Sequence, residues 1–251
     1  MLKKVLLPIT AMAMSSLAIA SDSNNNLEKR VEQLEAQVKF LSTLMTRVQN
    51  NQNVIAKNVG LIKDEKIEAG QPVPLFGFLD GKKDSKVFVM EFTDQECPYC
   101  RTFSVAEYPK IKEELISKGK VSFLHLQKPL NIHPNAFNAS KQIFCAAEQG
   151  KYLEAKKEMF MNADYVKQQR YKDSLNNVEL DWAKMEKCLV STRPLDRLAK
   201  DEDLAERLNI SQTPSFVIGR KEGNELVDWE LVTGNLTVDE LTKKIEVLDK
   251  K

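Results

Sequence analysis

Two cysteines separated by two residues, Cys97 and Cys100, form the pattern in this sequence that most directly implies chemistry. A Cys-x-x-Cys pair can be a redox-active dithiol, half of a metal site or a structural disulfide. A metal site needs further ligands at usable spacing. The chain has only two histidines, and its two other cysteines stand apart from each other. We therefore predict no metal, and no cofactor other than the cysteine pair itself.

The position of the pair favours redox chemistry over a structural disulfide. Residues 86–92 are rich in Val and Phe and predict a buried strand, and residues 98–117 predict a helix interrupted at Pro109. Unpaired N–H groups and the macrodipole at a helix start stabilise a thiolate. We expect Cys97 to be an exposed, acidic nucleophile and Cys100 to be a buried resolving thiol. Such a pair acts through a mixed disulfide with its substrate.

The remaining pattern predicts an α/β domain over residues 75–251. A strand–helix–strand unit implies a parallel strand pair with a right-handed crossover. A long helical stretch at about 134–208 separates this unit from a hairpin and a last helix, which opens with a capping box at Thr237. The further strand candidates are residues 75–79, 121–126, 215–218 and 226–232.

Three segments resemble DsbA-like proteins of the thioredoxin superfamily. The segment from Glu91 to Cys100 is similar to the active-site segment of that family. The sequence Ile132-His133-Pro134-Asn135-Ala136, with Cys145-Ala146-Ala147-Glu148-Gln149-Gly150-Lys151 after it, is similar to the start of the family's helical insertion. Gln212-Thr213-Pro214-Ser215-Phe216-Val217-Ile218-Gly219 resembles its cis-proline loop. The resemblance implies a thioredoxin fold with an inserted helical subdomain.

The resemblance also implies a role for each residue of the motif. Cys97 would be the attacking thiolate and Cys100 the resolving thiol. Pro98 and Tyr99, between them, would tune the redox potential.

The resemblance implies roles for residues outside the motif as well. By resemblance, Pro214 would be cis and would face the cysteines, and Thr213 would offer backbone groups to a substrate strand. An acid at the position of Glu91 would be buried, with a raised pKa suited to proton transfer with the resolving thiol; the alternative is a solvated strand residue. We expect Asp94 and Glu96 to be solvated charges.

Residues 27–62 repeat core positions in alternating steps of four and three, as in a coiled coil. A lone helix would expose this stripe, so we expect a homo-oligomer; the alternative is one helix packed on the chain's own globular domain. β-Branched residues at several of these positions favour a trimer slightly over a dimer. The stripe consists of Leu27, Val31, Leu34, Val38, Leu41, Met45, Val48, Gln52, Ile55, Val59 and Ile62.

The chain start has the form of a secretory signal, with a short positive segment, an apolar run and small residues before a cleavage site after Ala20. A membrane anchor is the alternative, although the apolar run is short for one. The formal net charge of +1 gives no reason to expect nucleic acid. We predict a periplasmic protein with a signal peptide at 1–20, a stalk at 21–62, a linker at 63–74 and a catalytic domain at 75–251.

Cys145 and Cys188 both fall in the helical stretch. Export permits disulfides, and an unpaired buried pair would be at risk of oxidation, so we favour a structural disulfide between them. The alternative is two free thiols on separate helices.

Oxidases, reductases and isomerases share this chemistry. An oligomer presents several active sites to one misfolded chain, as in the DsbC and DsbG isomerases and in ScsC-like proteins, which this chain resembles in layout. Thr213 before Pro214 also resembles the isomerase-type loop. We predict an oligomeric disulfide isomerase with exported, cysteine-containing substrates and a membrane redox partner. A DsbA-like oxidase and a thioredoxin-fold chaperone or metal-tolerance module are the alternatives.

Overall fold

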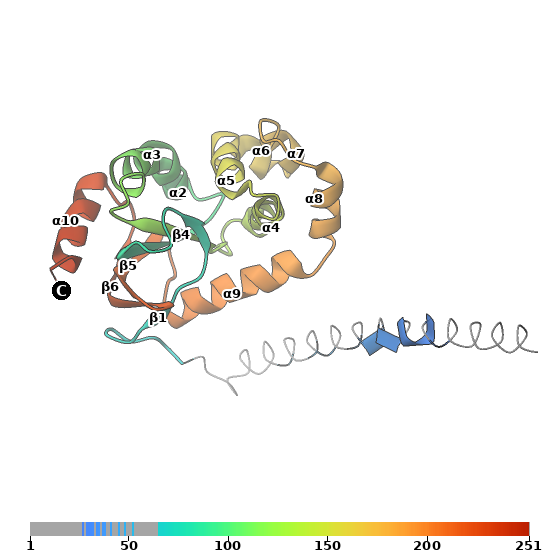
Figure 1. The fold of residues 1–251 in the computed structure, drawn as a ribbon. Coiled ribbons are helices and arrows are strands. Elements are labelled where there is room, and N and C mark those ends of the chain that lie inside the picture. The colour runs from blue at the N-terminus through green and yellow to red at the C-terminus, as the bar shows by residue number, and fades with distance from the viewer. Residues whose placement is uncertain are drawn as a thin grey trace, which may run out of the picture. The chain divides into compact units, whose positions relative to one another are not determined.

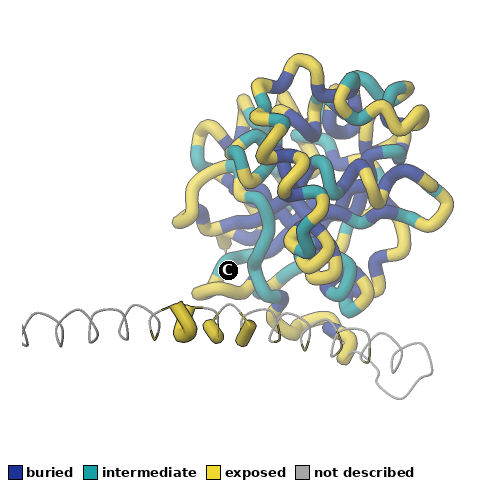
Figure 2. The backbone as a smooth tube through the Cα atoms, turned by 90° about the vertical axis from the view of Figure 1, so that its right-hand side faces the viewer, coloured by how far each residue is buried: buried dark blue, intermediate teal, exposed yellow. Residues whose placement is uncertain are grey.

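The computed structural model describes residues 27, 29–32, 34, 35, 37, 38, 41, 45, 48, 52 and 65–250. The chain divides into two units, Met1–Asp64 and Glu65–Lys251. In the first unit every described residue is helical and exposed (Figure 2). The expected signal peptide, the linker residues 63 and 64 and the stripe positions Ile55, Val59 and Ile62 lie outside the described residues.

The second unit is built on a mixed sheet with the strand order β1-β6-β5-β3-β4-β2 (Figure 1). Strands β3 and β4 pair in parallel, as the strand–helix–strand pattern predicts, and the other pairs are antiparallel. Every residue of β3 is buried, which explains its run of Val, Phe and Met. The strands are β1 Val73–Pro74, β2 Phe78–Asp80, β3 Val87–Thr93, β4 Ser122–Gln127, β5 Ser215–Glu222 and β6 Glu225–Thr233.

Helices cover both faces of this sheet. Val87 and Val89 of β3 pack with the helices that follow the cysteine motif and with α10, whereas Phe88, Met90 and Phe92 pack with α9 on the other face. The capping box expected at the start of α10 is present. The helices of these two layers are α2 Pro98–Thr102, η1 Phe103–Glu107, α3 Tyr108–Ile111, η2 Lys112–Ile116, α9 Arg193–Arg207 and α10 Val238–Leu248.

The expected interruption at Pro109 takes the form of a wider helical turn. A proline inside a helix lacks an N–H group and crowds the carbonyl four residues before it. In the π-helical segment η1, the Tyr108 N–H donates to the carbonyl of Phe103, five residues back. This wider turn lies directly before Pro109, and a second π-helical segment, η2, follows α3.

The helical insertion, which comes between β4 and β5 along the chain, forms a subdomain with its own apolar core beside the sheet (Figure 1). Gly150, with a φ of +74°, follows the end of its first helix, and Asn162 separates the second from the third. These are two of the breaks expected from the sequence. The helices of the subdomain are α4 Ala136–Ala147, α5 Tyr152–Met161, α6 Ala163–Lys167, α7 Tyr171–Ser174 and α8 Trp182–Leu189.

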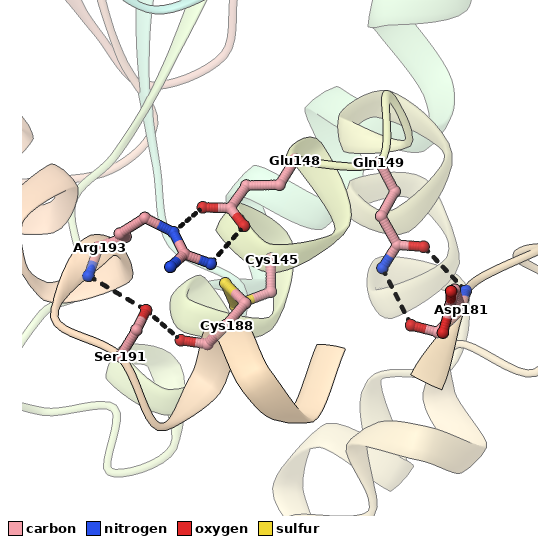
Figure 3. Close-up of a disulfide and its surroundings, with 7 residues drawn as sticks. All are labelled: Cys145, Glu148, Gln149, Asp181, Cys188, Ser191 and Arg193. Carbon is pink, nitrogen blue, oxygen red and sulfur yellow. Dashed lines mark hydrogen bonds and ion pairs between the residues drawn. A yellow bond between two sulfur atoms is a disulfide. The ribbon is translucent and has the colours of Figure 1, made fainter. Parts of the chain in front are cut away.

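A disulfide joins Cys145 of α4 to Cys188 of α8, with Cα atoms 5.7 Å apart (Figure 3). Beside it, Arg193 donates from Nε and Nη2 to the carboxylate of Glu148, at 2.7 and 2.9 Å. The Gln149 amide exchanges two hydrogen bonds with the backbone of Asp181, at the start of α8. These contacts hold the C-terminal end of α4 against both ends of α8.

Replacing both cysteines, in Cys145→Ala/Cys188→Ala, is expected to destabilise the protein by about 4 kcal/mol, because the bridge restricts a large loop in the unfolded chain. Urea unfolding of the variant and of wild type measures the difference. Alkylation without reductant, read by mass spectrometry, should leave Cys145 and Cys188 of wild type unmodified. Modification of both would show that the bridge is absent in solution.

Candidate active site

The cysteine pair lies where β3 ends and α2 begins. Cys97 is the N-cap of α2, and its sulfur accepts the N–H of Cys100 at 3.4 Å. Cys100 is fully buried, as expected, but Cys97 is only 3% exposed, so the expectation of an exposed nucleophile is wrong. Pro98 and Tyr99, between the cysteines, are exposed instead. A substrate must therefore reach a side chain that the surrounding protein covers almost completely.

The two thiols are chemically different although three residues apart. The Cys100 thiol and the backbone N–H groups of Tyr99 and Cys100 lower the pKa of Cys97 to about 6, against the effect of burial. Burial, and then the hydrogen bond to Cys97, raise the pKa of Cys100 well above its ordinary value. At neutral pH Cys97 is therefore mainly a thiolate and Cys100 a thiol. This is the electronic arrangement of a nucleophile with a resolving partner.

The Thr213–Pro214 peptide bond is cis and lies beside Cys97. The sheet places this loop beside Cys97. Strand β5 begins directly after the loop and runs antiparallel to β3, with Ser215 opposite Phe92. The Cys97 thiol, when protonated, donates to the Thr213 carbonyl at 3.3 Å. The Thr213 hydroxyl is buried and has no hydrogen-bond partner within the described part of the chain. Two of the three sequence segments that resemble one family, the cysteine motif and the cis-proline loop, thus meet here.

Asp94 holds the loop before the motif, so the expectation that it is solvated is wrong. Its side chain is fully buried and accepts hydrogen bonds from the backbone of Glu96 and Leu130, at 2.8 and 2.7 Å. His133 contributes a third contact, with Nδ1 2.9 Å from the carboxylate. The Asp94 carbonyl also accepts the N–H of Cys97.

Glu96 is half-buried and links the motif to the helical subdomain. Its carboxylate accepts the backbone N–H and the side-chain amide of Asn135, at 2.5 and 3.0 Å. The same amide donates to the carbonyl of Lys167, at the end of α6. The expectation of a solvated charge is therefore wrong for Glu96 as well. Both carboxylates are used to orient the segment that carries Cys97.

Glu91 is buried, and the alternative of a solvated strand residue is wrong. The expected raised pKa is also wrong. Burial does raise the pKa of Glu91, but the Lys156 ammonium and His125 outweigh it and lower the pKa to about 2. Lys156 Nζ lies 2.7 and 2.6 Å from the two carboxylate oxygens, and His125 Nδ1 lies 2.5 Å from one of them. Glu91 is thus an ionised, paired carboxylate.

Lys156 is the residue of the site that we did not identify from the sequence. It lies on the inner face of α5, is 2% exposed and is four residues before Phe160, which packs against Cys97 and Cys100. The signal was a lysine at the helical spacing of buried residues, between Tyr152 and Phe160. Helix α5 therefore contacts the cysteine pair at one turn and Glu91 at the next.

A cavity of about 330 Å³ lies beside the active-site helix, lined by Arg101 of α2 and by the α5–α6 junction. Its lining is mostly polar and includes Asp164 and Tyr165. In the described part of the chain no group of three or more His, Cys, Asp or Glu residues is arranged to hold a metal ion.

A family model described as thioredoxin matches residues 77–245. The chain belongs to the thioredoxin family. The match spans strands β2 to β6, the cysteine pair, the cis-proline and the helical insertion. The fold is also similar to that of the Wolbachia pipientis protein alpha-DsbA1. The similarity covers 70% of this chain and 92% of that chain, with a TM-score of 0.59 and 22% sequence identity. A thioredoxin fold with an acidic first cysteine and a resolving second cysteine makes this chain a thiol–disulfide oxidoreductase.

Two curated relatives match part of the chain. A Bacillus anthracis protein named probable disulfide bond formation protein D is 29% identical over 57% of this chain and 70% of its own length. A Salinispora tropica protein named Na(+)/H(+) antiporter NhaA 3 is 31% identical over 56% of this chain, but this chain spans only 21% of that protein. No helix in the described residues is long and apolar enough to cross a bilayer.

The acidity of Cys97 can be measured by thiolate absorbance during a pH titration of the reduced protein. The transition is expected near pH 6, with thiolate above it. In Cys100→Ala the midpoint should rise, because the hydrogen bond from the Cys100 thiol is lost. Cys97→Ser should show no transition in this range. A wild-type midpoint near the ordinary value of a thiol would contradict the assignment of Cys97 as the nucleophile.

The Glu91–Lys156 pair should make stability depend on pH. The folded pKa of Glu91 is about 2, below its ordinary value of 4.5, so its contribution is present above 4.5 and is lost as the pH falls toward 2. Lys156→Met should reverse this dependence, because burial then raises the pKa of a carboxylate that has lost its ammonium partner, and should destabilise the protein by about 3–5 kcal/mol at neutral pH. Urea midpoints between pH 2 and 7 test both effects. Glu91→Gln/Lys156→Met, with no unpaired charge, should be more stable than Lys156→Met; equal stability would contradict the assigned pairing.

Proposed function

We propose that this protein is an exported, homo-oligomeric disulfide isomerase that attacks wrongly paired disulfides through Cys97. The observation that carries the proposal is the combination of a stalk with a redox site on the same chain. In this scheme Cys97 forms a mixed disulfide with the substrate, the substrate rearranges, and Cys100 releases it when rearrangement fails. A membrane redox partner keeps the cysteine pair reduced between cycles.

The described stalk residues support assembly. Those at stripe positions are helical and solvent-exposed, including Leu27, Leu34 and Leu41, which are 56, 58 and 57% exposed. Helices of this kind associate because water-exposed apolar stripes are buried on contact. The unbroken heptad repeat indicates that the apolar stripe binds further copies of the same helix, with a trimer favoured slightly over a dimer. Several Cys97 sites would then act on one bound substrate.

The surroundings of Cys97 support a protein substrate. Thr213 offers a backbone carbonyl next to the reactive sulfur, so an extended substrate segment can pair with this loop. Tyr99, between the two cysteines, is 72% exposed and offers an aromatic contact to such a segment. A polar cavity lies beside Arg101 of the same helix.

A DsbA-like oxidase is the second candidate, and one observation favours it. The Bacillus anthracis relative is named for disulfide bond formation. In an oxidase the Cys97–Cys100 disulfide would be donated to newly exported chains, and the stalk would not be needed for the reaction. A capture module without turnover, such as a chaperone or metal-tolerance factor, is less well supported, because the strongly different acidities of Cys97 and Cys100 suit repeated exchange.

Refolding of scrambled ribonuclease tests the proposal. The full chain is expected to restore ribonuclease activity, Cys97→Ser to restore none, and a chain without residues 21–62 to reduce disulfides normally but to isomerise at least several-fold more slowly. Leu34→Asp/Leu41→Asp should act like the deletion, because it places charges in the stripe. The oligomeric state of each form is measured by sedimentation.

Lys29→Asp is the matched control, because Lys29 lies on the same helix outside the stripe. It should assemble and isomerise as wild type does. Normal isomerisation by the truncated form would contradict the role of the stalk and would favour the oxidase. Normal activity of Cys97→Ser would contradict catalysis by the cysteine pair altogether.

A further inference from the structure

The cavity at Arg101, with a volume of about 330 Å³, lies beside the cysteine pair. Arg101 directly follows Cys100, and its backbone N–H donates to the carbonyl of Cys97 at 3.0 Å, one helical turn back. Met161, also in the lining, directly follows Phe160, which packs against both cysteines. Two lining residues are thus chain neighbours of the cysteine cluster, one on α2 and one on α5.

The lining carries one positive charge without a partner. The Arg101 side chain is exposed and makes no ion pair or hydrogen bond with the residues that the structure describes. The carboxylate of Asp164, also in the lining, is 88% exposed and lies 3.5 Å from Lys167 Nζ. The negative charge of Asp164 is therefore offset by a neighbouring lysine, whereas the charge of Arg101 is available to a ligand.

The hydrogen-bond donors of the lining also favour an anionic ligand. Asn162 uses both hydrogens of its side-chain amide, in bonds to the Glu158 carboxylate at 3.1 Å and to the Ser174 carbonyl at 3.2 Å. Tyr165 is half-buried, and its hydroxyl has no hydrogen-bond partner in the described part of the chain. The donors left for a ligand are thus the Arg101 guanidinium and the Tyr165 hydroxyl, and both suit a carboxylate.

The spacing from Cys97 to Arg101 matches two residues of an extended substrate segment. Four residues of a helix rise roughly 6 Å. In an extended segment two residues span roughly 6.6 Å, and their side chains point to the same face. A side chain two positions from the substrate cysteine can therefore reach Arg101 while that cysteine reaches Cys97.

We propose that this cavity binds a glutamate or aspartate side chain of the substrate, two residues from the cysteine that Cys97 attacks. The carboxylate accepts hydrogen bonds from the Arg101 guanidinium and the Tyr165 hydroxyl, and the mostly polar lining receives it without an apolar environment around its charge. The inference rests on the proposed function and adds a substrate preference to it: disulfides with an acidic residue at this spacing react faster.

Three end-blocked peptide disulfides test the preference. In each, the residues two positions before and after a single cysteine are both Glu, both Gln or both Lys, with Ala between. The reduced Cys100→Ala protein is used, so that the reaction stops when the Cys97 sulfur has bonded to one peptide and the other has left as a thiolate. Adduct formation is followed by acid quenching and mass spectrometry, and each rate is divided by the rate of the same disulfide with 2-mercaptoethanol. The Glu peptide should react about three- to fivefold faster than the Gln peptide, as for an exposed ion pair, and the Lys peptide more slowly.

Arg101→Met, made in the same Cys100→Ala protein, should bring the Glu and Gln rates together, because it removes the charge and keeps an unbranched side chain. Lys118→Met is the matched control. Lys118 is exposed and follows η2, at the other end of the same helical run, so its loss changes the net charge equally but away from the cavity. This variant should keep the full preference for Glu. The two rates are compared within one protein, so that a general change in the reactivity of Cys97 cancels.

A fourth peptide, with Glu directly beside the cysteine, separates the cavity from general attraction between charges. Neighbouring side chains of an extended segment point to opposite faces, so this peptide should react at the rate of the Gln peptide. A preference that persists in this peptide or in Arg101→Met would overturn the inference, and so would equal rates for Glu, Gln and Lys. If no peptide forms an adduct, exchange at Cys97 itself is wrong, and the proposed function fails with it.

Discussion

The Lys156 ammonium lies between the two carboxylate oxygens of Glu91, at 2.7 and 2.6 Å, inside the protein. Burying either charge alone would cost several kcal/mol, so each requires the other. Glu91 belongs to the central strand β3 and Lys156 to helix α5 of the insertion. The pair therefore fixes the helical subdomain at one depth against the sheet. The position of Phe160 against Cys97 and Cys100 follows from the same constraint.

Two further carboxylates fix the segment that joins β3 to α2. Asp94 binds the loop after β4, and Glu96 binds Asn135, directly before α4. The motif is thus attached on one side to the sheet and on the other to the insertion. This arrangement explains how a nearly buried Cys97 can keep a defined orientation toward Thr213. The active site is a product of the junction between the two parts, and neither part would form it alone.

Local patterns in the sequence predicted the features that depend on neighbouring residues. Examples are the cysteine pair at a helix start, the hairpin and the capping box at Thr237. The errors concern Glu91, Asp94, Glu96 and the exposure of Cys97. All of these depend on partners far along the chain: Lys156 is 65 residues from Glu91, and Asn135 is 39 residues from Glu96. A residue type fixes what a side chain can do, but its charge state depends on which groups the fold places beside it.

The pKa of Glu91 is lowered, whereas the sequence predicted a raised pKa. This difference changes the explanation of how Cys100 resolves the mixed disulfide. A carboxyl with a raised pKa could itself accept the proton of Cys100 near neutral pH, but a carboxylate held at a pKa of about 2 is a weak base. Attack by Cys97 needs no base, since its thiolate already exists at pH 7. Resolution by Cys100 does need one, because burial raises the pKa of Cys100 well above its ordinary value, so the mixed disulfide persists until a proton is removed. A delay at this step gives a bound substrate time to exchange its own cysteines, which is the kinetic condition that isomerisation requires and that simple oxidation does not.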